Sequence, residues 1–454
     1  MLASASVPGQ PQTRAAGPPA LALAALPCLT LGAVLGYGNP AVGVVLVVAA
    51  LALTVLAALD IGGRGEVWAL LSVVLFTAML VLLADLPAWT FIAAPVAGGA
   101  YRLALRSRWW WFGALPALAL QVAVLQQRWH WGRAAIDVFD TLQSATRHLL
   151  QGQNPYFFQY KDLAPQPKWH LVMAPFQYGP AALYLDVPGR LLGDVRVLTA
   201  AAAALTGVAL VLIARRRGRA QLQQVSFLVA SLPLFAPMIV NAWVDVYTAA
   251  GLAVWWLLRE RQWLAGSIIL GIGAAAKPVM LVGLLPFLVW DRTVRRDAVV
   301  AAGAGLLLCV PFLVWTGPVK FIYAVAGVHV QVLNEIWPTS VTFNALLLKA
   351  HLPTIPDAVS VAVLLASIPT AMLWRPTRQD VRLLIAVAFM LAALLLSKQS
   401  FLNYYYVVVI WLLLAIAERP AAAHAAVDAL HEGSPPTSRI AGGLPLRSPG
   451  DAGS

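Results

Sequence analysis

Residues 197–219 read VLTAAAAALTGVALVLIARRRGR, and this stretch decides the fold class. Residues 197–214 carry no charge, and four arginines follow within the next five positions. An apolar helix of about 20 residues crosses the hydrocarbon of a bilayer. Arginines beside such a run mark its cytoplasmic end. The stretch therefore predicts a transmembrane helix that ends on the cytoplasmic side.

The rest of the chain repeats this pattern. Of its 454 residues, 60% are hydrophobic and only 11% are charged, whereas soluble domains carry about 25% charged residues. We therefore predict an all-α polytopic membrane protein with about 12 to 14 transmembrane helices. The other apolar segments are 21–37, 41–59, 67–84, 88–105, 109–127, 225–240, 246–258, 264–276, 279–290, 298–315, 358–374, 381–397 and 402–417.

The basic residues predict the orientation. The net charge is +12, but the arginines cluster in short links between apolar segments, which is a topology signal and not a nucleic-acid surface. Links near Asn39, Asp85 and Asn241 hold no arginine or lysine. This pattern predicts a multi-pass protein of the cell membrane, with both termini in the cytoplasm, a lipid bilayer around it and no nucleic-acid partner.

The same map divides the chain into regions. Treating Lys277 as the outer end of a hairpin keeps the arginines of 292–296 inside, so we prefer it to one continuous span. The two cysteines lie in apolar segments, which favours free thiols, and no Cys/His spacing suggests a metal or other cofactor. The predicted regions are a disordered tail (1–20), an N-terminal transmembrane block (21–127), an outer loop with interfacial helices (128–196), a transmembrane core (197–417) with a second outer loop (317–357), and a disordered tail (418–454).

The outer loop holds two acids, Asp137 and Asp140. A helix over 137–151 would place both acids on one face with Gln143, and apolar residues on another face. This pattern predicts an amphipathic helix along the membrane interface, which Gly152 ends. One acid could take a proton from a hydroxyl group, or both could simply be solvated.

Further candidates lie beyond this loop. Lys277 interrupts an apolar stretch, which indicates either a site or a side chain that reaches the headgroups. We expect Asp245 to cap the next helix. His329 could bind phosphate or be structural. Lys398 with Asn403 and Tyr404 could bind a phosphate or sugar, or belong to an interfacial aromatic belt.

Three motifs resemble one family. They are Asp137 followed by Gly152-Gln153-Asn154-Pro155-Tyr156 and Phe176-Gln177-Tyr178-Gly179-Pro180, then residues 269–278 ending in Lys277-Pro278, and then residues 398–406. Their order resembles the polyprenyl-phosphate-dependent GT-C glycosyltransferases, most closely the bacterial family 87 mannosyltransferases. The resemblance covers about residues 136–417, and residues 21–127 look like an additional block.

The resemblance implies a function. The protein would move a sugar, mannose or another hexose or pentose, from a polyprenyl-phosphate donor to a glycolipid or glycan hydroxyl on the extracytoplasmic face, with inversion and without a metal. It implies Asp137 as general base, with Asp140 in reserve. It implies Lys277, Lys398 and His329 at the donor phosphate, and Gln143, Asn154, Tyr156, Tyr178, Asn403 and Tyr404 around the sugar.

Two other functions remain open from the sequence. A transporter or flippase for lipid-linked sugars would also span the membrane many times. Such proteins often carry inverted repeats and acids near mid-membrane. The sequence has no clear repeat, and its acids lie in the predicted outer loops. A non-catalytic membrane protein of envelope assembly is the other alternative.

Overall fold

The computed structural model describes residues 20–58, 137–164, 170–232, 234–327, 336–337 and 340–419. All of them belong to one compact unit, Gly17–Arg419. The predicted spans 67–84, 88–105 and 109–127, the candidate His329, and nearly all of both predicted tails lie outside the described residues.

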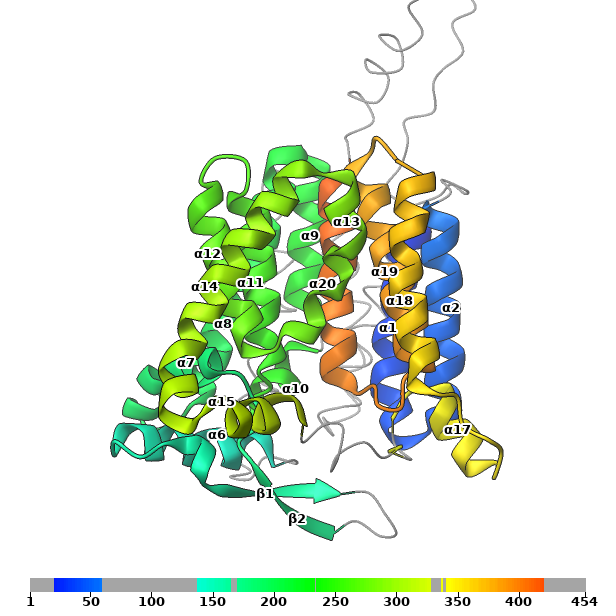
Figure 1. Ribbon diagram of the computed structural model, residues 1–454. Coiled ribbons are helices and arrows are strands. Elements are labelled where there is room, and N and C mark those ends of the chain that lie inside the picture. Colours follow the sequence, from blue (N-terminus) through cyan, green and yellow to red (C-terminus); the bar gives the residue numbers. More distant parts are fainter. Residues whose placement is uncertain are drawn as a thin grey trace, which may run out of the picture. The chain divides into compact units, whose positions relative to one another are not determined.

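The described part is built from 16 α-helices and one small hairpin (Figure 1). The helices are α1 (Ala20–Gly38), α2 (Pro40–Ala58), α6 (Val138–Leu150), α7 (Pro180–Leu191), α8 (Arg196–Arg217), α9 (Arg219–Ser231), α10 (Phe235–Val240), α11 (Asp245–Leu258), α12 (Trp263–Ala276), α13 (Leu285–Trp290), α14 (Arg292–Thr316), α15 (Pro318–Ile322), α17 (Phe343–Lys349), α18 (Asp357–Leu373), α19 (Gln379–Leu396) and α20 (Leu402–Glu418). Two 3-10 helices, η3 (Pro155–Phe157) and η4 (Pro278–Leu284), and a π-helical turn (Tyr323–Gly327) complete the helical elements.

Three of these helices, α8, α14 and α19, are long and apolar enough to cross a membrane. They suggest a multi-pass membrane protein. The described helices follow the predicted apolar segments closely, and residues 317–356 connect the end of α14 to the start of α18. One predicted span, 225–240, is divided into α9 and α10. The sequence has a proline at this division, and proline lacks the N–H that a continuous helix needs.

Helix α20 lies in the middle of the bundle (Figure 1) and packs against α1, α8, α11 and α19. Nearly all of its side chains are buried, from Leu402 to Glu418. Its sequence explains this position, because a helix that is apolar all round has no face that favours water.

Helix α14 has the opposite environment. Only 17% of the residues in its most apolar stretch are buried inside the protein, and the Leu307 and Val314 side chains are 72% and 81% exposed. Exposed apolar side chains along a helix of membrane length fit contact with lipid tails. The opposite face of α14 packs closely against Gly271 of α12. A Cβ at Gly271 would lie only 2.3 Å from the carbonyl oxygen of Ala301 on α14, so only glycine permits this approach. Small residues permit such close approach of apolar helices.

The predicted hairpin at Lys277 is confirmed. Lys277 pairs with Asp245 at the start of α11, and Asp291 pairs with Arg259 just after the end of α11. The chain therefore returns along α11 between residues 277 and 291. Lys277 is extended (φ −158°, ψ 90°), as expected for a residue before proline. The 7 residues of η4 rise about 2.0 Å each in 3-10 geometry, about 14 Å in all. The 6 residues of α13 add about 9 Å, so η4 and α13 together match the length of the 14-residue α11, about 21 Å.

One small β hairpin, which the sequence analysis did not predict, accompanies the helices. Strands β1 (Gln159–Ala164) and β2 (His170–Pro175) form an antiparallel pair in which Gln159 faces Pro175 and Ala164 faces His170. A hairpin this small is marginal by itself. Tyr160 anchors it, since its hydroxyl donates to the carbonyl oxygen of Pro155 at 3.1 Å.

Candidate functional site

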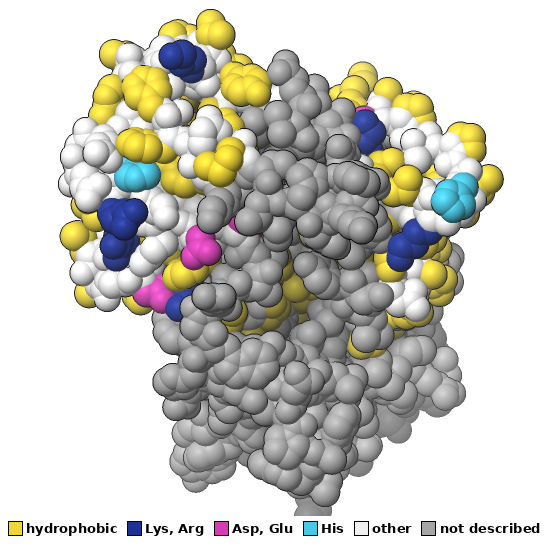
Figure 2. Space-filling view, turned by 90° about the horizontal axis from the view of Figure 1, so that it is seen from below, with side chains coloured by type: hydrophobic (Ala, Val, Ile, Leu, Met, Phe, Trp, Pro, Cys, Tyr) yellow, Lys and Arg dark blue, Asp and Glu magenta, His cyan; other side chains and the backbone are white. Residues whose placement is uncertain are grey.

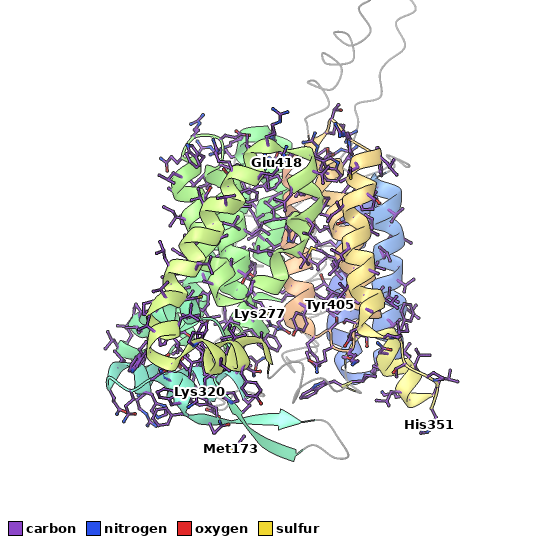
Figure 3. The ribbon with its side chains drawn as sticks, in the orientation of Figure 1. Met173, Lys277, Lys320, His351, Tyr405 and Glu418 are labelled. Atoms are coloured by element: carbon purple, nitrogen blue, oxygen red, sulfur yellow. The ribbon has the colours of Figure 1, made fainter. Side chains whose placement is uncertain are left out.

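The bundle has two chemically different ends. At one end, Arg217 pairs with Glu418, and Arg259 pairs with Asp291 at 3.0 Å. We call this the arginine end. The other end, here the loop end, carries α6, α7, the hairpin, α15 and α17 (Figure 1). Figure 3 places Glu418 at the arginine end and Lys277 toward the loop end.

Four side chains meet near the loop end, and we call them the lysine cluster: Lys277, Asp245, Asn403 and Tyr404. The Lys277 Nζ lies 3.0 Å from Oδ1 and 3.1 Å from Oδ2 of Asp245. The Asn403 amide donates to Asp245 Oδ2 at 2.8 Å. The ammonium also lies 4.4 Å from the ring centroid of Tyr404. These residues come from α11, α20 and the link after α12.

The lysine cluster keeps a cation at a partly open position. The Asp245 side chain is 0% exposed, whereas that of Lys277 is 16% exposed. Burial alone would lower the pKa of Lys277, but the attraction of the Asp245 carboxylate outweighs burial and raises this pKa above its usual value. The cluster can therefore offer a charged N–H donor to an anionic group such as a phosphate.

The expected role of Asp245 as a helix cap is wrong. Val244 occupies the cap position of α11, and no side chain makes a capping hydrogen bond there. Asp245 follows it, and its carboxylate turns to Lys277 and Asn403. Sequence reasoning missed this role of Asp245 because its partners are 32 and 158 positions away. An acid at the edge of an apolar segment was the only signal.

The start of α7 touches the helix that presents Lys277. The Gly179 N–H donates to the Ala276 carbonyl oxygen at 3.1 Å. A Cβ at Gly179 would lie only 1.9 Å from the carbonyl oxygen of Ala275. Glycine at this position thus permits the segment before α7 to reach the backbone beside Lys277.

Asn154 and Tyr156 hold the segment between α6 and α7 in place. Asn154 accepts from the Tyr156 N–H at 3.0 Å and donates to Thr316 Oγ1 at 2.9 Å. The Tyr156 hydroxyl donates to the Tyr178 carbonyl oxygen at 2.8 Å. Asn154 and Tyr156 are buried, so these two predicted sugar contacts support the loop structure, while Tyr178 is half-buried and contributes its backbone.

Helix α6 has the predicted amphipathic character. It buries Val138, Leu142 and Ala145 and exposes Asp140. Gly152 follows its end with φ +71°, which is the left-handed conformation typical of a helix stop. Asp137 is half-buried at the start of the helix.

The predicted base and the lysine cluster lie apart. Gln143 donates to the Gly193 carbonyl oxygen at 2.9 Å and accepts from the Val195 N–H at 3.2 Å. This places the first half of α6 at the C-terminal end of α7. Lys277 lies at the N-terminal end of α7, beyond Gly179. The 12 residues of α7 span about 18 Å.

Of the two other predicted phosphate ligands, Lys398 pairs with Asp357 at 2.9 Å, and His329 lies outside the described residues. Figure 2 looks onto the loop end, where the described lysine, arginine and histidine side chains are scattered over two areas instead of gathered in one patch. Within the described ranges, no group of three or more His, Cys, Asp or Glu side chains is arranged to hold a metal ion.

A second buried acid, Asp186, lies on α7. The Tyr247 hydroxyl donates to its Oδ1, whereas Oδ2 has no hydrogen-bond partner. Burial raises the pKa of Asp186 to about 8, although the Tyr247 hydrogen bond opposes this shift. Asp186 is therefore mostly neutral at pH 7 and joins α7 to α11.

No protein-family model, no curated protein and no solved structure matches this chain. What the site can do therefore rests on its own chemistry.

Proposed function

We propose that this protein is an integral membrane glycosyltransferase of GT-C type. It moves a sugar from a polyprenyl-phosphate donor to a glycolipid or glycan hydroxyl. The reaction takes place on the extracytoplasmic face, at the loop end of the bundle, and inverts the anomeric carbon. A carboxylate acts as general base and Lys277 holds the donor phosphate, whose charge grows as it leaves.

One observation supports this proposal more than any other. The motif segments that resemble the family are far apart in the sequence but are linked by contacts. Tyr156 binds the backbone of Tyr178, and the adjacent Gly179 binds Ala276. Lys277 then contacts Tyr404 and Asp245. The chain of contacts ends on a partly exposed cation at one end of an apolar bundle.

The separation of Asp137 from Lys277 restricts the mechanism. The base and the donor phosphate must act within a few ångströms of one anomeric carbon. Asp137 and Lys277 lie at opposite ends of α7, so both can serve one transfer only if α6 and α7 shift against α12 when substrates bind. Asp140 shares this condition, because it belongs to the same helix.

The decisive experiment measures sugar transfer in membranes that contain the full chain. Labelled polyprenyl-phosphate hexoses and pentoses serve as donors, and a membrane lipid extract supplies acceptors. We expect Asp137→Asn to lower the rate by about 10²- to 10⁴-fold, as for loss of a general base, with Asp140→Asn tested beside it. Glu260→Gln is the control, since Glu260 is exposed at the arginine end.

Two results would count against the proposal. If transfer survives both Asp137→Asn and Asp140→Asn, the base is assigned to the wrong helix. If the unmodified chain transfers no sugar from any of these donors, the enzyme function itself is wrong.

A flippase for lipid-linked sugars is the second candidate. The interrupted segments at α9/α10 and at Lys277 favour it, since transporters often build sites from broken helices. Movement of a labelled lipid-linked sugar across vesicles that contain the chain, without any transfer product, would support this candidate.

A further inference from the structure

The position of Asp245 is energetically unfavourable for a carboxylate. Its side chain is fully buried at the first turn of α11, and a buried carboxylate is strongly unfavourable unless it is paired and hydrogen-bonded. Both requirements are met by residues from other segments, namely the ammonium of Lys277 and the amide of Asn403. A helix start alone does not need this arrangement.

A comparison within the protein shows what is special about the pair. Asp297, on α14 at the arginine end, is also buried and accepts from the Trp255 indole N–H at 3.0 Å. Its cationic partner, Arg296, is 45% exposed and keeps its charge in contact with the surroundings. Lys277 is only 16% exposed, so its charge depends far more on its partner.

The geometry also restricts where the lysine can point. An ammonium has three N–H donors and no acceptor. The Asp245 carboxylate occupies one side of Lys277, and the Tyr404 ring lies 4.4 Å away on another. In the described structure, these are the titratable groups that act on Lys277. The Lys277 side chain keeps 16% of its surface exposed, which leaves a side where a further N–H donor can meet a ligand.

We propose that Asp245 is a positioning residue: its buried carboxylate keeps the Lys277 ammonium charged and turns its remaining N–H toward the open side, where an anionic phosphate group binds. The role of phosphate rests on the proposed function. The control of lysine charge by Asp245 does not, and it can be tested without any substrate.

The first test reads the charge of Lys277 directly. Only the neutral amine reacts with an acylating reagent, so the pH dependence of labelling, followed by mass spectrometry on the purified full chain, reports the lysine's protonation. Lys320 and Lys349 are exposed and serve as internal standards. In the unmodified chain, we expect Lys277 to need a higher pH than either standard before it reacts.

Asp245→Asn removes the charge and keeps the size of the side chain. We expect its Lys277 to label at least about tenfold faster than in the unmodified chain at the same pH, which corresponds to one pKa unit or more. Asp245→Glu keeps a carboxylate and should keep labelling slow. Equal labelling rates of Lys277 in Asp245→Asn and in the unmodified chain would overturn the inference. Equally fast labelling of Lys277 in Asp245→Asn and Asp245→Glu would overturn it as well.

The second test uses transfer activity. In Asp245→Asn, activity should fall as pH rises toward the usual lysine pKa of about 10.4, whereas Asp297→Asn should keep the pH profile of the unmodified chain. Adding Lys277→Arg to Asp245→Asn should restore a flat profile, because a guanidinium stays charged. A purely structural role would lower activity equally at every pH.

The two tests separate two failures. If labelling responds to Asp245→Asn but the unmodified chain transfers no sugar, the inference stands and the proposed function fails. If transfer occurs but neither labelling nor the pH profile responds, Asp245 does not control Lys277.

Discussion

The backbone N–H of Gly179 donates a hydrogen bond to the carbonyl oxygen of Ala276, 3.1 Å away, and so joins the segment between α6 and α7 to the helix that presents Lys277. This contact is backbone to backbone, and no side chain at position 179 takes part. Its existence depends on the absence of a Cβ. The position of α7 against α12 is therefore sensitive to the smallest possible substitution.

Gly179→Ala should disturb the site. The added Cβ would lie 1.9 Å from the Ala275 carbonyl oxygen, so α7 must move away from α12. We expect a loss of about 1 to 3 kcal/mol in stability, as for an overpacked contact, and a lower transfer rate. Gly303→Ala is the matched control, because a Cβ at Gly303 meets nothing within 4 Å. Equal unfolding temperatures and rates for the two variants would contradict the close approach.

The Asn154 side chain should stabilise the segment between α6 and α7 more than an ordinary helix cap does. Asn154→Ala removes the cap of η3 and leaves the Thr316 hydroxyl without its donor inside the protein. We expect a cost of about 2 to 3 kcal/mol, because a buried polar group loses its partner. Asn39→Ala removes only an exposed cap of α2 and should cost about 1 kcal/mol or less. Thermal unfolding in detergent compares the two, and a smaller effect at Asn154 would argue against the tie to α14.

Asp186 should make the stability of the protein depend on pH. In the unfolded chain this acid loses its proton near 3.8, its ordinary pKa, whereas in the folded protein it keeps the proton up to about pH 8. Between these values the folded state binds more protons, so stability should fall as pH rises and level off above about 8. Asp186→Asn has no proton to lose, so its stability should fall less over this window.

The measurement is the unfolding temperature at about pH 5 and about pH 8, values that bracket most of this window. The control is Glu260→Gln, an exposed acid whose removal should leave the pH dependence as it is in the unmodified chain. The interpretation is wrong if Asp186→Asn and the unmodified chain lose the same stability between the two pH values.

The predicted topology can be tested with single cysteines. In a chain with Cys28 and Cys309 replaced by alanine, Lys320→Cys lies at the loop end and Glu260→Cys at the arginine end, and both positions are exposed. A membrane-impermeant thiol reagent added to intact cells should label position 320, whereas position 260 should react only after the membrane is opened. The reverse pattern would place the loop end in the cytoplasm.

Much of the fold could be predicted from the sequence because its signals are local. An apolar run of sufficient length predicts a helix, and arginines beside it indicate which end of the bundle it reaches. The return of the chain at Lys277-Pro278 was also predictable, from the arginines that follow and from the restriction that proline places on the residue before it. The β hairpin was missed, because it depends on contacts such as that between Tyr160 and Pro155.

By itself, the sequence determined the helical class and the approximate limits of most described helices, and it indicated most of the polar residues near the loop end. Only the tertiary structure decided which of these residues meet. It paired Lys277 with Asp245, which the sequence analysis had assigned to a helix cap, and it placed Asp137 at the far end of α7. The physical reason is that a buried charge takes its partner from whichever helix packs beside it, and neighbours 32 or 158 residues away leave no local pattern in the chain.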